Sequence, residues 1–307
     1  MWKTVLALIV TIIVIPFVAF RFDDPLNALQ SATLTRVVII YLIAAVLCFL
    51  VSTIADNYSQ VDKLWSIMPL AYTWVVAWDG GFEPRLVLMA VLVSIWGIRL
   101  SYNFSRRGGY SIRFWTGDED YRWAVLRAKP EFAAKWKWLV FNLFFISLYQ
   151  MGLILLMTLP AVRSMGGGPI TYVDGILSVL VIALVVVELV ADQQQWNFHK
   201  QKRLLLEKGG ELPEKYKKGF IDTGLWGVVR HPNYAAEQAI WIVFYFFSVV
   251  ATGQWINWSV MGAILLVLLF LGSSNFSETI SSGKYPGYKN YIKRVPRFIP
   301  WFSKPEK

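Results

Sequence analysis

A polar cluster stands at the start of an apolar run near the end of the chain. The stretch RHPNYAAE, residues 230–237, directly precedes QAIWIVFYFFSVVAT, residues 238–252. Pro232 suits a first helical turn and Asn233 could cap free backbone N–H groups, so a purely structural interpretation exists. That interpretation leaves Glu237 unexplained, because its carboxylate falls one turn beyond Asn233 on the same face. The cluster therefore suits hydrogen bonding and proton transfer as well as helix initiation.

Other ionisable side chains interrupt apolar segments earlier in the chain. Arg99 shares a helical face with Asn103 and Arg106, at i+4 and i+7. Glu188 and Asp192 are spaced i, i+4, so both carboxylates line one face, where they repel unless a cation or proton joins them. Ionisable groups inside membrane helices are costly, so each is a functional hypothesis by default.

The same residue types also have structural interpretations. Asp62 falls at a helix start, where a carboxylate stabilises the helix dipole. Arg99 could extend its charge to the membrane interface. Asp192 lies about one turn from the basic segment HKQKR and could pair with it. Glu278 follows the last apolar block and could be solvated. The residues alone leave both interpretations open.

The elements that must position these residues are apolar blocks. The chain has 307 residues, of which 56% are hydrophobic, and a membrane-crossing helix needs about 20 apolar residues. Backbone facing lipid must be helical. The blocks lie near 4–20, 34–55, 64–79, 86–104, 138–160, 174–196, 237–252 and 255–273. Because some are short, the sequence predicts an all-α, polytopic membrane helix bundle with seven to eight transmembrane helices, the first retained rather than cleaved.

Positive charge predicts the orientation. Three segments, 105–136, 199–237 and 281–307, hold 22 of the 30 Lys and Arg residues. The positive-inside rule places these segments and both termini in the cytoplasm, as a cap built from loops. We expect a single integral membrane domain over residues 1–307. The net charge of +10 is then explained by topology and attraction to membrane lipids, without nucleic acid.

Two cap segments carry local expectations. Residues 117–136 are predicted to form a short interfacial helix, with Asp120 among the acids that complement its dipole. Residues 207–224 are predicted to be a solvated loop. Tryptophans near the first segment are typical of an aromatic belt at headgroup depth: Trp115, Trp123, Trp136 and Trp138.

Missing motifs exclude several chemistries. The single Cys48 excludes an intramolecular disulfide and a cysteine metal cluster, and we expect it to pack as a small hydrophobe. Two histidines, His199 and His231, are too few for a di-iron or haem enzyme, so no metal site is expected. There is no Walker A motif, no Rossmann fingerprint and no nucleophile elbow. A nucleotide would have to bind between membrane helices.

In combination, the motifs resemble the steroid 5-alpha-reductase superfamily. GLWGVVRHPNYAAE is similar to its C-terminal signature, and KYPGYKNYIKRVPRFIPWF is similar to its tail. VDKLWSIMP, WGIRLSYNFSRR, GDEDYRW and ADQQQWNF resemble a bacterial branch of steroid-reductase-like membrane proteins, related to sterol C14 reductases and isoprenylcysteine methyltransferases. The likeness covers residues 55–302 and implies a bacterial inner-membrane location.

The resemblance implies an NADPH-dependent membrane reductase that acts on a carbon–carbon double bond in a lipid or steroid-like enone. NADPH would lie in a cytoplasm-facing cavity, and a hydrophobic small molecule would enter from the bilayer. Such chemistry needs cations for the phosphates, hydrogen-bond partners for the riboses and nicotinamide, and an acid near the enone oxygen. Oligomeric state is left open.

Residue roles follow from the same likeness. The expected cofactor-binding residues are Arg99, Asn103, Arg106, Arg107, Arg113, Glu188, Asp192, His231, Asn233, Tyr234, Glu278 and Tyr285. The expected catalytic residues are Asp62, Tyr102 and Glu237. The chain departs from the pattern at the catalytic tyrosine, where it has Trp96, which donates only an indole N–H. Tyr102, Tyr58 or a protonated Asp62 could supply the proton instead.

Two other function classes compete. A membrane methyltransferase of the isoprenylcysteine or phospholipid type has a similar R-H-P-x-Y helix start and binds S-adenosylmethionine. Asn233 and Glu237 favour the reductase, as does the arginine-rich segment 99–113, because S-adenosylmethionine carries no phosphates. A non-enzymatic lipid-binding or scaffold protein is the third possibility, motivated by Trp96. A transporter is disfavoured, because the chain has no paired broken helices or inverted repeat.

Overall fold

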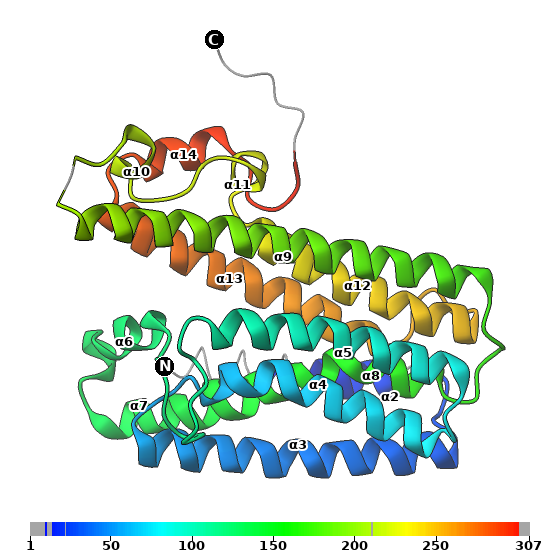
Figure 1. Ribbon diagram of the computed structural model, residues 1–307. Helices are drawn as coiled ribbons and strands as arrows, with labels where there is room; N and C mark the ends of the chain where they lie inside the picture. Colours follow the sequence, from blue (N-terminus) through cyan, green and yellow to red (C-terminus); the bar gives the residue numbers. More distant parts are fainter. Residues whose placement is uncertain (1–9, 11–13, 22, 210, 301–307) are drawn as a thin grey trace. The chain divides into compact units, whose positions relative to one another are not determined.

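The computed structural model describes residues 10, 14–21, 23–209 and 211–300, which form helices and no β-strand (Figure 1). The predicted all-helical class is confirmed for this part of the chain. The chain divides into two compact units. Unit 1 comprises Met1–Val179 and Trp241–Leu266, and unit 2 comprises Leu180–Ile240 and Val267–Lys307.

Unit 1 is a bundle in which α4 packs against both α5 and α8. Its helices include α2 (Ile15–Arg21), α3 (Ala28–Ala55), α4 (Gln60–Asp79), α5 (Pro84–Ser105), the π-helical η3 (Asn142–Tyr149), α8 (Gln150–Ser164) and η4 (Trp258–Val260). Fully buried apolar side chains fill the contacts, among them Met89, Ile154 and Met157. Where lipid surrounds the helices, such side chains stabilise the bundle through close van der Waals packing, because lipid tails are as apolar as the side chains.

The helix boundaries follow local chemistry. α3 begins with a capping box, in which the Asn27 side chain accepts from the Gln30 N–H and the Gln30 side chain accepts from the Asn27 N–H. It ends at Asp56, which is in the left-handed conformation. α5 begins at Pro84, at the position where a missing N–H costs nothing.

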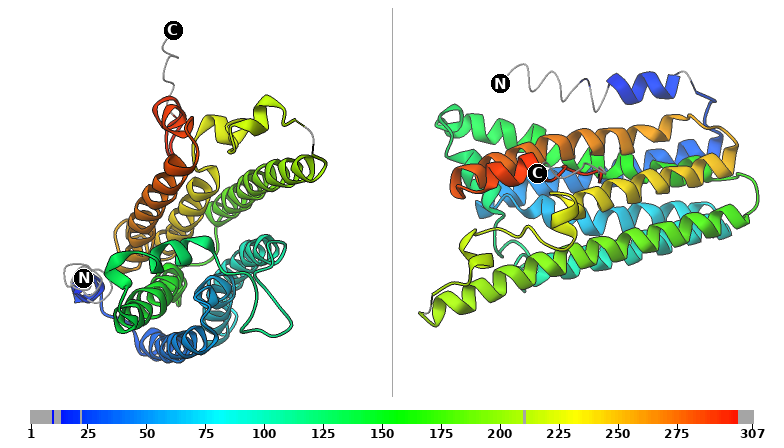
Figure 2. Two further views of the ribbon diagram at one scale, coloured as in Figure 1. Left: turned by 90° about the vertical axis from the view of Figure 1, so that its left-hand side faces the viewer. Right: turned by 90° about the horizontal axis from the view of Figure 1, so that it is seen from above.

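Unit 2 contains the ends of three long helices and the short helices that pack beside them. The long helices are α9 (Tyr172–Glu207), α12 (Pro232–Thr252) and α13 (Met261–Lys284). The short ones are α10 (Glu214–Lys217), α11 (Leu225–Val228) and α14 (Tyr288–Arg294), of which α10 follows the C-terminal end of α9 and α14 follows that of α13 (Figures 1 and 2).

Six helical segments are long and apolar enough to cross a membrane, which is compatible with an integral membrane protein. They are Ala28–Ala55, Pro84–Ser105, Lys135–Ser164, Tyr172–Glu207, Pro232–Thr252 and Trp258–Lys284. The predicted block 64–79 lies in α4, which is not among these six. The predicted block 4–20 falls largely outside the described residues, and α2 covers its end. A total of seven or eight spans therefore remains a prediction.

The predicted interfacial helix over 117–136 is interrupted. The segment forms α6 (Tyr121–Arg127), the 3₁₀ turn η2 (Pro130–Phe132) and the start of α7 (Lys135–Phe141). Proline at 130 explains the interruption, because it lacks the N–H that a continuing helix needs. Only part of the predicted tryptophan belt is exposed: Trp115 and Trp136 are exposed, whereas Trp123 and Trp138 are buried.

The prediction of a solvated loop over 207–224 is wrong for three side chains. Tyr216, Phe220 and Ile221 are buried in two apolar clusters of unit 2. The spacing of these three residues in the sequence fits neither a helix nor a strand. Their burial is therefore evident only from the way the short helices pack.

Candidate functional site

The polar cluster at the start of α12 is organised around Glu278 of α13. The Arg230 Nε and His231 Nε2 atoms lie 2.8 and 2.9 Å from the same oxygen, Glu278 Oε1. All three side chains are buried. Buried charges are tolerated only when paired and hydrogen-bonded, and here one carboxylate serves both neighbours. The alternative of a solvated Glu278 is therefore wrong.

The chain's tail is fastened to the same place. The backbone N–H groups of Arg230 and His231 donate to the carbonyls of Pro296 and Arg297, at 2.8 and 3.1 Å. The Arg297 guanidinium also lies 3.3 Å from Glu278 Oε2. These contacts fix the backbone that leads into α12. The sequence analysis did not identify Pro296 or Arg297 as part of this cluster.

Asn233 connects α12 to α9. Its side-chain nitrogen donates to Asp192 Oδ1 at 3.2 Å, and its oxygen accepts from the Tyr234 N–H at 3.0 Å. Asn233 is the second residue of α12, so it does not occupy the expected capping position before the helix. Two residues 41 positions apart, both expected to bind cofactor, are thereby brought into contact.

Three further predicted residues lie on these helices. The Tyr234 ring stacks on His231, with centroids 5.3 Å apart, and packs against Phe270. Glu188 on α9 and Glu237 on α12 are both buried, at 5% and 4% exposure. Carboxylates this deeply buried need a hydrogen-bonding or charged environment, which keeps both as functional candidates.

Tyr285 belongs to another part of unit 2. Its ring packs against Phe220, with centroids 5.8 Å apart, and the ammonium groups of Lys202 and Lys284 lie 5.6 and 5.4 Å from its centroid. Tyr285 thus contacts an aromatic cluster and two lysines, whereas Asn233 contacts Asp192 of α9.

In unit 1, the predicted residues of α5 form a second cluster. The Asn103 side-chain oxygen accepts from Arg106 Nε and Nη2, at 3.0 and 2.7 Å. The Arg106 guanidinium lies over the Tyr102 ring, 5.5 Å from its centroid. Arg99 and Asn103 are buried, whereas Tyr102 is 58% exposed. At the end of the helix, the Asn103 amide thus holds the Arg106 guanidinium in place.

The loop that follows carries two exposed arginines, Arg107 and Arg113. Lys63 of α4 anchors it: the buried ammonium donates to the carbonyls of Phe114 and Thr116, at 2.8 and 2.6 Å. Sequence reasoning overlooked Lys63. A lysine beside an apolar run could have indicated such an anchor, because a buried ammonium group needs hydrogen-bond acceptors.

Asp62 and Tyr58 lie where this loop meets α4. The Asp62 carboxylate accepts from the Trp123 indole N–H at 3.1 Å. The Tyr58 hydroxyl donates to Asp56 at 3.2 Å, and burial raises the pKa of Tyr58 above its usual value. The Tyr58 hydroxyl therefore keeps its proton at neutral pH.

Asp120 caps α6 as expected, accepting from the Arg122 N–H at 2.9 Å. Burial alone would raise the pKa of Asp120, but the charge and hydrogen bonds of Arg122 outweigh burial and hold that pKa below its usual range. The lowered pKa favours the ionised form of Asp120, the form that caps α6.

Trp96 is a packing residue of unit 1. Its indole is 1% exposed and meets the Trp241 indole edge to face, with centroids 5.0 Å apart and an interplanar angle of 81°. A large rigid side chain therefore fills the position at which the resemblance expected a tyrosine.

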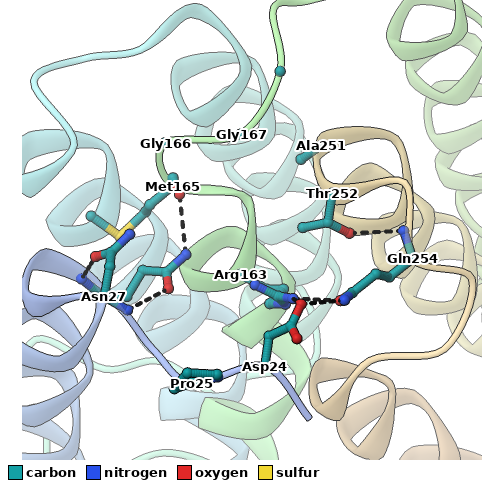
Figure 3. Close-up of a pocket in the computed structure, with 12 residues that line it drawn as sticks. Asp24, Pro25, Asn27, Arg163, Met165, Gly166, Gly167, Ala251, Thr252 and Gln254 are labelled. Carbon is teal, nitrogen blue, oxygen red and sulfur yellow. Dashed lines mark hydrogen bonds and ion pairs between the residues drawn. The ribbon is translucent and has the colours of Figure 1, made fainter.

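Unit 1 also contains a polar pocket of about 420 Å³ that none of the predicted site residues lines (Figure 3). In Figure 3 the Arg163 side chain points toward Asp24 and Gln254, and its Nη2 lies 3.6 Å from Asp24 Oδ2. The pocket lies where α8 ends, whereas the arginines described above follow the end of α5. Among the described residues, no group of three or more His, Cys, Asp or Glu side chains could hold a metal ion.

Comparison with known proteins identifies the family. Residues 48–295 match the family described as "Protein of unknown function (DUF1295)". The chain belongs to this family. It is also similar to the uncharacterized protein C594.04c of Schizosaccharomyces pombe, with 36% identity over 264 residues, covering 81% of this chain and 74% of that protein. No solved structure matches the chain. The DUF1295 match includes the α5 cluster and the Glu278 cluster except for Pro296 and Arg297.

Proposed function

We propose that this DUF1295 protein is an NADPH-dependent membrane reductase that acts on a carbon–carbon double bond in a lipid or steroid-like enone. The observation that carries the proposal is the 3.2 Å contact between Asn233 and Asp192. Both residues are expected to bind cofactor from the resemblance to steroid 5-alpha-reductases. A half-buried amide beside a buried carboxylate suits the hydroxyl groups of a ribose, because together they offer both donors and acceptors.

The donor set of unit 1 fits the rest of the dinucleotide. Its phosphates need fixed cations, and guanidinium groups bind phosphate through paired N–H donors. Arg99, Arg106, Arg107 and Arg113 stand at the end of α5 and in the loop after it.

NADPH would supply the hydride, and the chain must supply orientation and a proton. We assign Glu237 to the substrate, where it would polarise the enone or hold the lipid in place. The proton would come from Tyr102, Tyr58 or Asp62, because Trp96 lacks a hydroxyl and is buried against Trp241. A hydroxyl or carboxyl near the enone oxygen neutralises the charge that develops as hydride is transferred.

The proposed setting is the bilayer, with the arginine- and lysine-rich ends in the cytoplasm. Six membrane-compatible helices and the concentration of positive charge in three segments support it. We place the protein in a bacterial inner membrane with both termini cytoplasmic, so that NADPH reaches the site from the cytoplasm and the apolar substrate from the lipid.

The test is cofactor binding by the purified protein in detergent, measured by calorimetry with NADPH and with S-adenosylmethionine. We expect micromolar NADPH binding and no S-adenosylmethionine binding. Arg99→Ala and Asn233→Ala should each weaken NADPH binding about 10- to 150-fold, as expected when a hydrogen bond to a charged group is lost. The matched controls are Arg203→Ala and Asn197→Ala, which are exposed on α9. Equal NADPH affinity in all five proteins would rule out the proposed pocket, and binding of S-adenosylmethionine alone would favour a methyltransferase.

A further inference from the structure

A second binding feature lies wholly within unit 2, between α10 and α14. It is a groove of about 480 Å³, which we call the α10–α14 groove. Its cationic lining is Lys217, Lys218 and Arg294, and its apolar lining includes Phe220, Pro286 and Tyr291. None of the residues assigned to cofactor binding lines it.

The segment that forms one wall of the groove carries charges of one sign. Residues 279–300 contain five Lys and Arg residues and no Asp or Glu. Lys217, Lys218 and Arg294 are 43%, 47% and 68% exposed, so their charged groups reach solvent at the groove. A segment with a net positive charge attracts phosphate-bearing surfaces.

Acidic side chains hold the cations in place, and Lys217 pairs with Glu211 and Glu214. Asp222 Oδ2 lies 2.7 Å from Lys218 Nζ and 3.3 Å from Arg294 Nη2, and the Asp222 side chain is only 8% exposed. A single internal anion shared by two cations orients both toward the groove without neutralising them. It also competes with any external anion for the same donors.

The floor of the groove places it where α9 leaves its apolar part. Phe220 packs on Tyr291, with ring centroids 5.3 Å apart, and the Tyr291 hydroxyl donates to the Trp226 carbonyl. The Trp226 indole N–H in turn donates to the carbonyl of Ala191 on α9, at 3.0 Å. Ala191 ends the mainly apolar run VVVELVA, and the polar DQQQ follows. These contacts therefore connect the groove to the part of α9 where apolar sequence gives way to polar sequence, as is typical near lipid headgroups.

We propose that the α10–α14 groove binds the phosphate of an anionic membrane phospholipid. Lys217, Lys218 and Arg294 would contact the phosphate oxygens, and Phe220 and Pro286 would contact the glycerol and the first methylenes. Basic pockets at the cytoplasmic ends of membrane helices recognise anionic headgroups in this way. The proposal uses none of the residues of the NADPH site, so either can fail without the other.

The experiment compares phosphatidylglycerol with phosphatidylcholine in native mass spectrometry of the detergent-solubilised full chain. Lys217→Gln, Lys218→Gln and Arg294→Gln combined should weaken retention of phosphatidylglycerol about 100-fold, or about fivefold for each charge. The matched control removes three exposed cations on α9 and directly after it, in Lys200→Gln, Arg203→Gln and Lys208→Gln. This control should retain phosphatidylglycerol as the wild type does.

A gain of binding separates the proposal from misfolding. Asp222→Asn removes the competing carboxylate and should increase phosphatidylglycerol retention severalfold, which a damaged fold would not do. Unchanged retention in both the groove triple variant and Asp222→Asn would overturn the proposal. Displacement of the lipid by millimolar inorganic phosphate would also overturn it, because the site would then be one for free phosphate. NADPH affinity measured on the same samples reports on the proposed function separately.

Discussion

At the scale of single residues, the buried acids differ in the side chains with which they form hydrogen bonds and ion pairs. Glu278 holds Arg230, His231 and Arg297 together and so positions the start of α12. Asp192 meets the amide of Asn233 instead. A single sequence could identify these acids as costly, but not their partners, because Glu278 lies 48 positions from Arg230 along the chain.

Glu237 is the acid to which we assign the substrate. Glu237→Gln keeps the size of the side chain and removes its charge, so NADPH affinity should stay unchanged while enone-dependent NADPH oxidation falls about 100-fold. The assay follows NADPH absorbance with a panel of enone lipids. The control is Glu211→Gln, an exposed acid that pairs with Lys217. Wild-type turnover by Glu237→Gln would make Glu237 a structural residue.

At the scale of elements, long helices were predictable and the joints between them were not. The apolar blocks located α3, α5, α9 and α12, because lipid-compatible helices need long apolar runs. The break of 117–136 follows from Pro130 itself, but the burial of Phe220 depends on tertiary packing. So does the π-helix η3, where Asn142 donates to Ser52 and Thr53 of α3 at 3.0 Å. No periodic pattern marks any of these features.

The loop after α5 offers a test at this scale. Lys63→Met removes a buried ammonium from the carbonyls of Phe114 and Thr116. We expect the local stability of residues 110–120 to fall by about 1.5–3 kcal/mol, because hydrogen bonds to a charged group are lost. Hydrogen exchange should be correspondingly faster in that segment alone. Lys137→Met, whose ammonium lies over Trp136 on α7, is the control. Unchanged exchange in 110–120 would show that other contacts hold the loop.

At the scale of the whole molecule, the sequence predicts one membrane bundle, and the described residues form two compact helical units. Hydropathy and charge were sufficient for the helical class and for a membrane setting. They were insufficient for the complete set of spans. Helix α4 contains polar residues such as Lys63, which holds the loop after α5, and α4 is not among the six segments that are apolar enough to cross a membrane. The candidate site was predictable as a set of residue types. Its internal contacts, such as Asn233 with Asp192, required the fold.

The central claim is the proposal that the protein binds NADPH, with a ribose at Asn233 and Asp192. The most direct measurement is an experimental structure of the full chain purified with NADPH in lipid nanodiscs. We predict density for a dinucleotide with a ribose in contact with Asn233 and Asp192. A structure in which NADPH is bound away from Asn233, or is absent at saturating concentration, would contradict the account.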